Sequence, residues 1–153
     1  MKKDKLTKKE IKELIKQGVP GYDQVVFQLI KSGEFEEAYY YVDKKMDYII
    51  KKLLDMSDED LSLLAYIEAM IGDYQFTKAA LDNLYENGDV MIDEKHLDLY
   101  GTLASALYHK NKNHNRRYKA LLKQALMFKP DENHCGADEY LLNQAKSLLE
   151  EVK

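Results

Sequence analysis

Apolar residues recur at steps of three and four positions along almost the whole chain, and this spacing constrains the fold more than any other feature. It places apolar side chains on one face of an α-helix. Sustained alternation of apolar and polar residues, which marks a half-buried strand, does not occur. The clearest stripes are Phe35, Ala38, Tyr39, Val42, Met46, Ile49, Ile50 and Leu53; Leu97, Tyr100, Leu103, Ala104, Leu107 and Tyr108; Tyr118, Leu121, Leu122, Ala125 and Leu126; and Leu141, Ala145, Leu148, Leu149 and Val152. The periodicity predicts an all-α protein.

Turn and cap residues divide this pattern into separate helices. The chain has only 7 glycines and 2 prolines, too few for a sheet protein, which needs a turn about every 8–12 residues. Thr7 and Glu10 have the spacing of a capping box, and Ser57 precedes an acidic first turn, as an N-cap does. Gly33 and Gly72 can take the left-handed conformation that ends a helix. Helices are expected over residues 4–17, 21–32, 34–54, 58–71, 73–87, 93–112, 115–128 and 137–152.

Four further boundaries follow from glycine, proline and acidic residues. Gly18 with Pro20 should stop the first helix, because proline cannot continue it. Gly88 should end another helix, and Asp93–Glu94 should begin the next, since acids favour the positive end of the helix dipole. Pro130 should close the seventh helix, because the residue before a proline is pushed out of the α region.

The composition favours one folded domain in a reducing compartment. A chain of 153 residues can form a single domain over residues 1–153, and 45% apolar residues exclude a disordered chain. A single cysteine, Cys135, cannot form an internal disulfide. The charged N-terminus does not resemble a signal peptide, and no apolar stretch reaches the ~20 residues of a membrane span. We therefore expect a cytoplasmic protein without a membrane contact.

Charge is distributed unevenly along the chain. The net charge is −4, but residues 1–16 carry +4, residues 17–98 carry −11, residues 99–130 carry +7 without any acid, and residues 131–153 carry −4. Such a polarity can steer a charged partner, or it can align two copies head to tail. The acid-free stretch is therefore a candidate binding surface.

Helix pairs joined by short turns recur along the chain. Gly33 and Gly72 are 39 residues apart, and the turn at 112–113 follows about forty residues later, a period typical of helical solenoids. Small and aromatic or aliphatic residues recur beside the turns: Val26, Leu29, Gly33, Phe35 and Ala38 in the first pair; Leu64, Ala65, Gly72, Tyr74 and Leu81 in the second; Ala104, Leu107, Ala125, Leu126 and Pro130 in the third. This pattern resembles the tetratricopeptide repeat over about residues 20–130.

The resemblance implies a right-handed α–α superhelix of about three tetratricopeptide-like hairpins over residues 20–130. A helix within residues 1–18 and another within residues 137–153 would cap its ends. The chain departs from the family pattern at Thr77, where the second pair lacks alanine, and at the 110–115 turn, which has no glycine. Its period also exceeds the family's usual length of about 34 residues.

In this family, the first helix of each hairpin lines the concave face, where a peptide or helix of another protein binds. The corresponding positions here are Phe27, Ile30, Lys31, Tyr66, Met70, Ser105, Tyr108 and His109. Several are apolar and lie beside the packing stripe of their helix, and apolar residues in a groove favour binding. A wider solenoid or a homodimer would bury them instead. The resemblance thus implies a non-catalytic protein–protein interaction module, such as a scaffold, an adaptor or a chaperone-like protein.

The basic segment 109–129 is the second candidate surface. The predicted basic patch within it consists of Lys110, Lys112, Arg116, Arg117, Lys119 and Lys123. Lysine and arginine neutralise phosphates, so a nucleic-acid-associated protein is the alternative function. A solvated helix face would explain the same charge run, and the net acidic chain has no recognised nucleic-acid motif.

Sequence patterns for catalysis, nucleotide binding or metal binding are absent. Neither a G-x-x-x-x-G-K-S/T loop nor a G-x-G-x-x-G loop occurs. His109 and His114 would point about 140° apart on an ideal helix, which makes a poor chelate. His134 adjoins Cys135 without a sign of the base and orienting group that a nucleophile needs, and Asp58–Asp60 suits the helix dipole better than catalysis. No enzymatic activity, metal or cofactor is expected.

Three of the twelve tyrosines are consecutive, Tyr39, Tyr40 and Tyr41, in the interior of an expected helix. Successive helical positions point about 100° apart, so the three side chains cannot all be in the core. Tyr39 lies on the apolar stripe and is expected inside. Tyr40 or Tyr41 must face another helix edge or solvent, either packing between hairpins or forming a contact surface.

Overall fold

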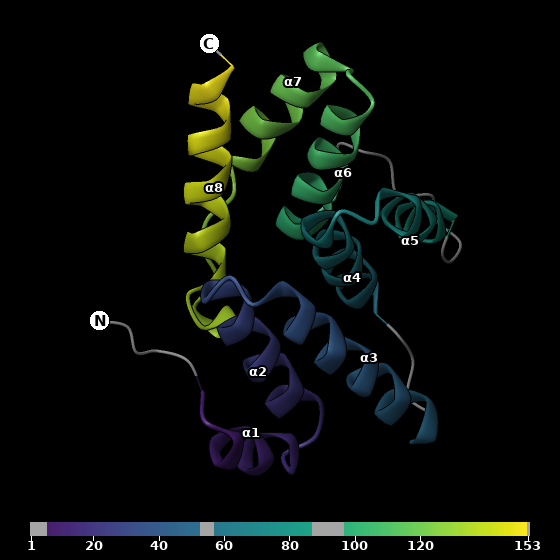
Figure 1. Cartoon of the computed structure of the whole chain (residues 1–153), viewed down its shortest axis with the longest axis vertical. Helices are drawn as coiled ribbons and strands as arrows, with labels where there is room; N and C mark the ends of the chain where they lie inside the picture. Colours follow the sequence, from purple (N-terminus) through teal and green to yellow (C-terminus); the bar gives the residue numbers. More distant parts are fainter. Residues whose placement is uncertain (1–5, 53–56, 87–96, 153) are drawn as a thin grey trace. The chain divides into compact units, whose positions relative to one another are not determined.

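The described part of the chain, residues 6–52, 57–86 and 97–152, is built from α-helices and short connections (Figure 1). The structure is a computed structural model of the chain. Its helices are α1 (Lys8–Ile15), α2 (Val19–Lys31), α3 (Phe35–Lys51), α4 (Asp58–Ile71), α5 (Tyr74–Glu86), α6 (Leu99–Asn111), α7 (Asn115–Ala125), the 3-10 helix η2 (Glu132–His134) and α8 (Ala137–Glu151). These ranges contain no strand. The all-α prediction is confirmed.

The chain divides into two compact units, each described here by itself. The first unit comprises residues 1–56 and 130–138, and the second comprises residues 57–129 and 139–153. The single domain expected from the length stays a prediction. Among the described helices, none has both the length and the apolar character needed to cross a membrane.

Two helices, α1 and α4, begin with a capping box. At α1, Thr7 Oγ1 accepts from the Glu10 amide at 3.1 Å, and the Glu10 carboxylate accepts from the Thr7 amide at 2.8 Å. The hydrogen bond from the Thr7 amide, followed by the Thr7 side chain, lowers the pKa of the Glu10 carboxyl below its usual value. Ser57 and Asp60 form the same reciprocal box at α4. A capping box satisfies two backbone N–H donors that have no partner within the helix, so both starts could be predicted from spacing alone.

Several predicted boundaries require correction. The seventh helix ends at Ala125, several residues before Pro130, and α2 already begins at Val19, with Pro20 in its first turn, where a missing N–H is tolerated. Residues 97 and 98, expected to be helical, precede α6, which begins at Leu99 because Asp98 acts as its N-cap and accepts from the Gly101 amide at 2.9 Å. Gly88 and the Asp93–Glu94 start lie outside the described residues.

In the first unit, α2 packs between α1 and α3. Its buried residues Val25, Val26, Phe27, Leu29 and Ile30 form most of the core. From α3 the buried residues are Ala38, Val42, Lys45 and Ile49. The predicted apolar stripe is therefore wrong near the end of α3, where Ile50 was expected in the core but is 66% exposed. The side of α3 that carries Lys45 and Ile49 faces the core, so the core of this unit includes a lysine.

Helices α1 and α2 approach most closely at Gly21. A Cβ atom at this position would lie 1.6 Å from the carbonyl oxygen of Leu14 and 3.3 Å from the Cβ of Gln17. Backbone atoms cannot yield as a flexible side chain can, so only glycine fits this contact. Gly21 thus sets the distance between the two helices.

We expect Gly21→Ala to displace α1 and to lower the free energy of unfolding by about 1–3 kcal/mol, the usual cost of overpacking. The eight-residue α1 can move away without disrupting α2 and α3. Amide hydrogen exchange of α1 and urea unfolding would measure both effects. Gly33→Ala is the control. At this position an added Cβ atom would have no other atom within 4 Å, so the substitution introduces only backbone strain at φ 76°. Unchanged protection of α1 in Gly21→Ala would contradict this account.

The second unit contains two helical hairpins, α4–α5 and α6–α7. Gly72 closes the first in the left-handed conformation, with φ 98°. Asn113 takes the same role in the second, with φ 63°; asparagine tolerates this region better than most residues do. This explains how the turn at residues 110–115 can form without a glycine.

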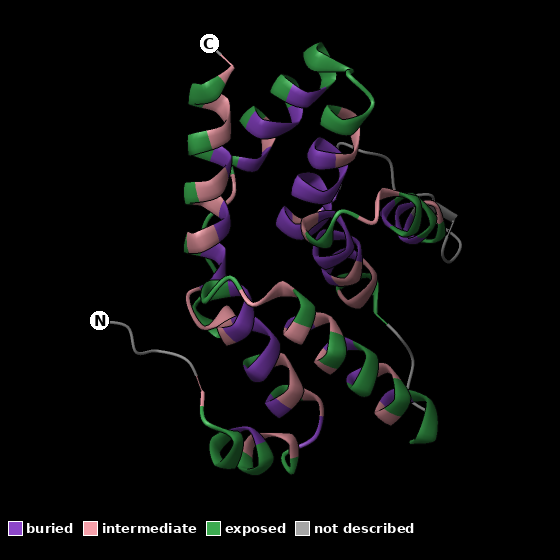
Figure 2. Cartoon of the chain, viewed as in Figure 1, coloured by how far each residue is buried: buried purple, intermediate pink, exposed green. Residues whose placement is uncertain are grey.

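Helix α6 lies at the centre of this unit. It packs against α4, α5 and α7, and every residue from Leu99 to Leu107 is buried (Figure 2). A helix surrounded by neighbours needs apolar or small residues on all faces. Leu63, Ala65 and Ile67 of α4 and Leu121 and Leu122 of α7 complete the packing around it.

Candidate functional site

The eight residues predicted to line a concave groove are not all accessible. Lys31 is exposed, and Met70, Tyr108 and His109 are partly exposed. Four others are buried: Phe27, Ile30, Tyr66 and Ser105. The prediction is wrong for these four as groove-lining residues, because a side chain without solvent exposure offers no surface to a partner.

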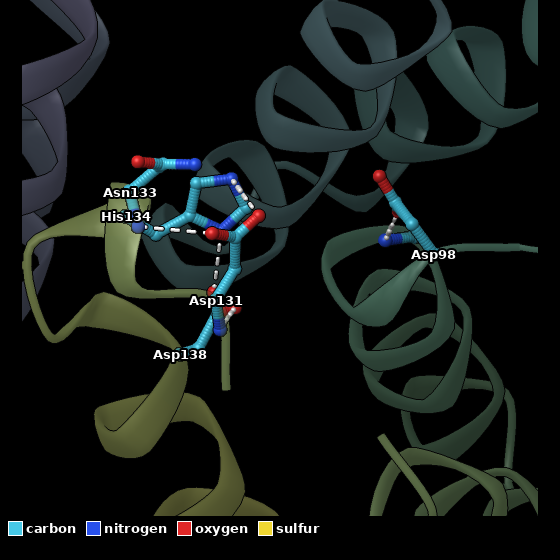
Figure 3. Close-up of polar contacts among 6 residues, drawn as sticks. Asp98, Asp131, Asn133, His134 and Asp138 are labelled. Carbon is cyan, nitrogen blue, oxygen red and sulfur yellow. Dashed lines mark hydrogen bonds and ion pairs between the residues drawn. The ribbon is translucent and has the colours of Figure 1, made fainter. Parts of the chain in front are cut away.

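Phe27 is covered by the short connection that precedes α8. The ring of His134 in η2 lies 4.7 Å from the Phe27 ring, measured between centroids. Asp138 holds this connection in place, as Figure 3 shows. Its carboxylate accepts from the Asp131 amide at 2.8 Å and lies 2.9 Å from Nδ1 of His134. Residues 131–138 thus form a clip over α2, where an open groove was expected.

Tyr66 is covered by α8 itself. Its hydroxyl donates to Oε1 of Gln144 at 2.6 Å, and Nε2 of Gln144 donates to the sulfur of Met70 at 3.1 Å. The Tyr100 ring packs edge-on at 5.9 Å. Burial, with a smaller effect of Tyr140, raises the pKa of Tyr66 well above 10.0. Gln144 of α8 therefore contacts the side of α4 that the predicted groove left open.

Tyr108 borders a separate cavity of about 510 Å³ in the second unit. The cavity is lined by Gly72, Asp73, Tyr74, Gln75, Lys78, Tyr108, Asn111 and Lys112. The Lys112 ammonium lies 5.7 Å from the centre of the Tyr108 ring. Tyr108 is thus a predicted groove residue that remains accessible. It lies beside a polar cavity, whereas the prediction placed it in an apolar groove.

The predicted basic residues are all accessible. Lys110, Lys112, Arg116, Arg117, Lys119 and Lys123 are each exposed on α6, α7 or the turn between them. Helix α7 buries Tyr118, Leu121, Leu122 and Ala125, so its opposite side must face solvent.

Three of these cations share one side of α7. Arg116, Lys119 and Lys123 are spaced at three and four residues, and with Asn115 and Ala120 they line an open depression of about 500 Å³. We call these three residues the basic face. No acidic residue occurs between positions 99 and 130.

His109 and His114 lie closer than the ideal-helix geometry predicted. Their Nδ1 atoms are 3.0 Å apart, because α6 ends at Asn111 and Asn113 reverses the chain. One ring donates this hydrogen bond and the other accepts it, so at least one must be neutral. Within the described residues, no group of three or more histidine, cysteine, aspartate or glutamate side chains is placed to hold a metal ion.

Cys135 is held in the clip in a left-handed conformation, with φ 53°. Burial raises the pKa of its thiol; Lys31 lowers it and Asp23 raises it further. A raised pKa disfavours the nucleophilic thiolate. His134 is directed at carboxylates, 2.9 Å from Asp138 and 3.8 Å from Asp131. These contacts give His134 a role in fastening the clip.

One accessible cavity was not predicted from the sequence. It lies in the first unit, has a volume of about 560 Å³, and includes Tyr40 and Tyr41 in its lining. Tyr40 is 51% exposed, whereas Tyr39 is only half-buried and not in the core. The run of three tyrosines was the available signal, since a helix cannot direct all three inward.

Comparisons with protein-family models, with curated proteins and with solved structures find no match to this chain. The tetratricopeptide resemblance over about residues 20–130 thus stays a prediction based on the residues quoted for it. The functional proposals below rest on the geometry of each unit.

Proposed function

We propose that this protein is a non-catalytic protein–protein interaction module whose basic face binds an acidic peptide or helix of a partner protein. The supporting observation is the accessibility of Arg116, Lys119 and Lys123 on a hairpin without acidic residues. Opposite charges across an interface accelerate association and select the partner.

The packing behind the basic face gives it a defined shape. Tyr118 and Leu122 are buried beneath it, so α7 is fixed against its unit and not free to rotate. Ala120 supplies a small apolar patch among the three cations. A partner helix with carboxylates around one apolar side chain would match this arrangement.

Nucleic acid is the second candidate ligand of the same surface. The neighbouring Arg116 and Arg117 favour it, because arginine binds phosphate through two parallel hydrogen bonds. Against it, the same unit carries Asp58, Glu59 and Asp60 in the first turn of α4, which would repel an extended polyphosphate. A short acidic segment of a protein can use the basic face without approaching these acids.

We expect the triple variant Arg116→Glu, Lys119→Glu, Lys123→Glu to bind its partner about 10–100-fold more weakly, since each reversal replaces an attraction with a repulsion. The matched control reverses the exposed lysines Lys9, Lys51 and Lys146. Each protein, immobilised at full length, would capture partners from nuclease-treated native extract, identified by mass spectrometry.

Proteins retained by the wild type and the control, lost from the basic-face variant and released by salt would support the proposal. Equal capture by the two triple variants would contradict it. Fluorescence anisotropy with a labelled RNA oligonucleotide tests the second candidate, whose affinity should fall steeply with salt.

A further inference from the structure

The cavity in the first unit has an apolar floor built by α1. Ile11 and Ile15, one turn apart on α1, line it together with Leu6, which precedes the helix. Ile11 is buried, while Leu6 and Ile15 are partly exposed. Gly21 brings α1 close enough to α2 to hold this floor in place.

Aromatic side chains form the opposite wall. Tyr40 and Tyr41 of α3 pack edge to face, with ring centroids 4.9 Å apart, and Tyr22 of α2 lines the cavity beside them. Burial raises the pKa of Tyr41, and Tyr40, Glu37 and Tyr22 add to the effect. The Tyr41 phenol therefore keeps its proton at neutral pH and can donate a hydrogen bond. Partly exposed tyrosines around an apolar floor are typical of protein-binding hot spots.

Lysines surround the opening. Lys8 and Lys12 lie one turn apart on α1, and Lys44 projects from α3; all three line the cavity and are exposed. The Lys44 ammonium lies 5.3 Å from the centre of the Tyr40 ring, a cation–π contact. Glu37 is the one carboxylate of the lining. The rim thus has a net positive charge, and its floor is aliphatic.

We propose that this cavity is a second docking site, which takes an apolar side chain from an acidic segment of a partner protein, with carboxylates of that segment facing Lys8, Lys12 and Lys44. A volume of about 560 Å³ is in the range of pockets that enclose small ligands or anchoring side chains. The cavity shares no residue with the basic face. An experiment can therefore refute one of the two binding proposals without affecting the other.

The floor and the acidic first turn of α3 favour a protein segment over single-stranded RNA. Bases stack on tyrosine, but the aliphatic floor of Leu6, Ile11 and Ile15 offers them little. Glu36 and Glu37 begin α3 beside the opening and would repel phosphates. An acidic peptide can place its carboxylates on the lysine side and its apolar residue on the floor.

The test uses a random twelve-residue peptide library displayed on phage and selected against the full chain. The expected peptides have net negative charge and a shared aromatic or aliphatic residue. In the labelled full chain they should shift the amide signals of Ile11, Tyr22 and Tyr41. This mapping uses the wild type and does not depend on a variant that folds.

Matched double variants then locate the contact. Tyr40→Ser with Lys12→Glu changes two exposed cavity residues and should weaken the selected peptides at least tenfold. Phe76→Ser with Lys9→Glu changes an exposed aromatic residue and an exposed lysine outside the lining, and should leave binding unchanged. The basic-face variant should also bind these peptides as the wild type does.

Three outcomes would overturn the proposal. The first is a failed peptide test: either no acidic, apolar motif is enriched, or the two double variants bind the selected peptides equally well. The second is an RNA oligonucleotide that shifts the same amide signals and loses affinity in Tyr40→Ser, Lys12→Glu. The third is a dimer in light scattering that this variant dissociates, which would make a second copy the occupant.

Discussion

The Tyr66→Ala variant should lose about 3–5 kcal/mol of unfolding free energy, the usual cost of truncating a buried aromatic residue. Tyr66 has no exposed surface, and its ring packs against Tyr100 while its hydroxyl reaches Gln144 of α8. A loss of this size is comparable to the whole stability of many domains. Urea unfolding monitored by circular dichroism would measure it.

Tyr66→Phe is the control for this substitution. It keeps the ring and removes only the hydroxyl that donates to Gln144, so we expect a loss of about 1–2 kcal/mol, the cost of a broken buried hydrogen bond. If Tyr66→Ala retained wild-type stability and lost only a binding partner, Tyr66 would be a groove residue after all, and its burial by α8 would be refuted.

The two variants also differ from the wild type at alkaline pH. Because the pKa of Tyr66 is raised above 10.0 in the folded protein, the native state holds its proton more tightly than the unfolded chain does. This contribution to stability is complete below pH 10 and is lost as pH rises toward the folded pKa. The Tyr66→Phe variant should lack this part of the alkaline destabilisation.

The Asp23→Ala variant should lose about 3 kcal/mol of unfolding free energy. Asp23 of α2 pairs with Lys45 of α3, with Nζ and Oδ1 2.5 Å apart, and the lysine side chain is only 4% exposed. Removing Asp23 takes away the ion-pair partner of a buried ammonium group, and this costs more than the pair itself contributes. Chemical denaturation of the first unit would measure the loss.

Lys45→Met provides the matched comparison. Methionine fills a similar volume without a charge, so this substitution alone should be much less destabilising, and in the Asp23→Ala background it should restore most of the lost stability. Losses that simply add in the double variant would show that the two side chains act independently, contrary to the geometry.

Local structure was predictable wherever the cause lies within a few residues. The capping boxes of Thr7 and Ser57 and the turns at Gly33 and Gly72 involve partners no more than five positions away. Such short-range hydrogen bonds are properties of the residues themselves. The inward edge of α3 was harder to predict, because Lys45 occupies an apolar register and its ion pair with Asp23 of α2 is a contact between distant residues.

The His109–His114 pair shows how a correct helix rule can mislead. The 140° separation holds only on an uninterrupted helix, whereas Asn113 at φ 63° places a turn between the two residues. An Asn between two polar residues was a recognisable turn signal. The resulting Nδ1 distance of 3.0 Å could not be derived from spacing.

The sequence by itself determined the helical character of the chain, the caps at Thr7 and Ser57, the turns at Gly33 and Gly72, and the exposure of the basic residues on α7. Each depends on periodicity or on contacts between near neighbours in the chain. Only the tertiary structure decided what covers each apolar face. Tyr66 meets Gln144 across 78 positions, and Phe27 meets His134 across an even longer interval. Periodicity tells which side of a helix is apolar, but a face that could bind a partner and a face that binds a distant helix of the same chain have the same composition.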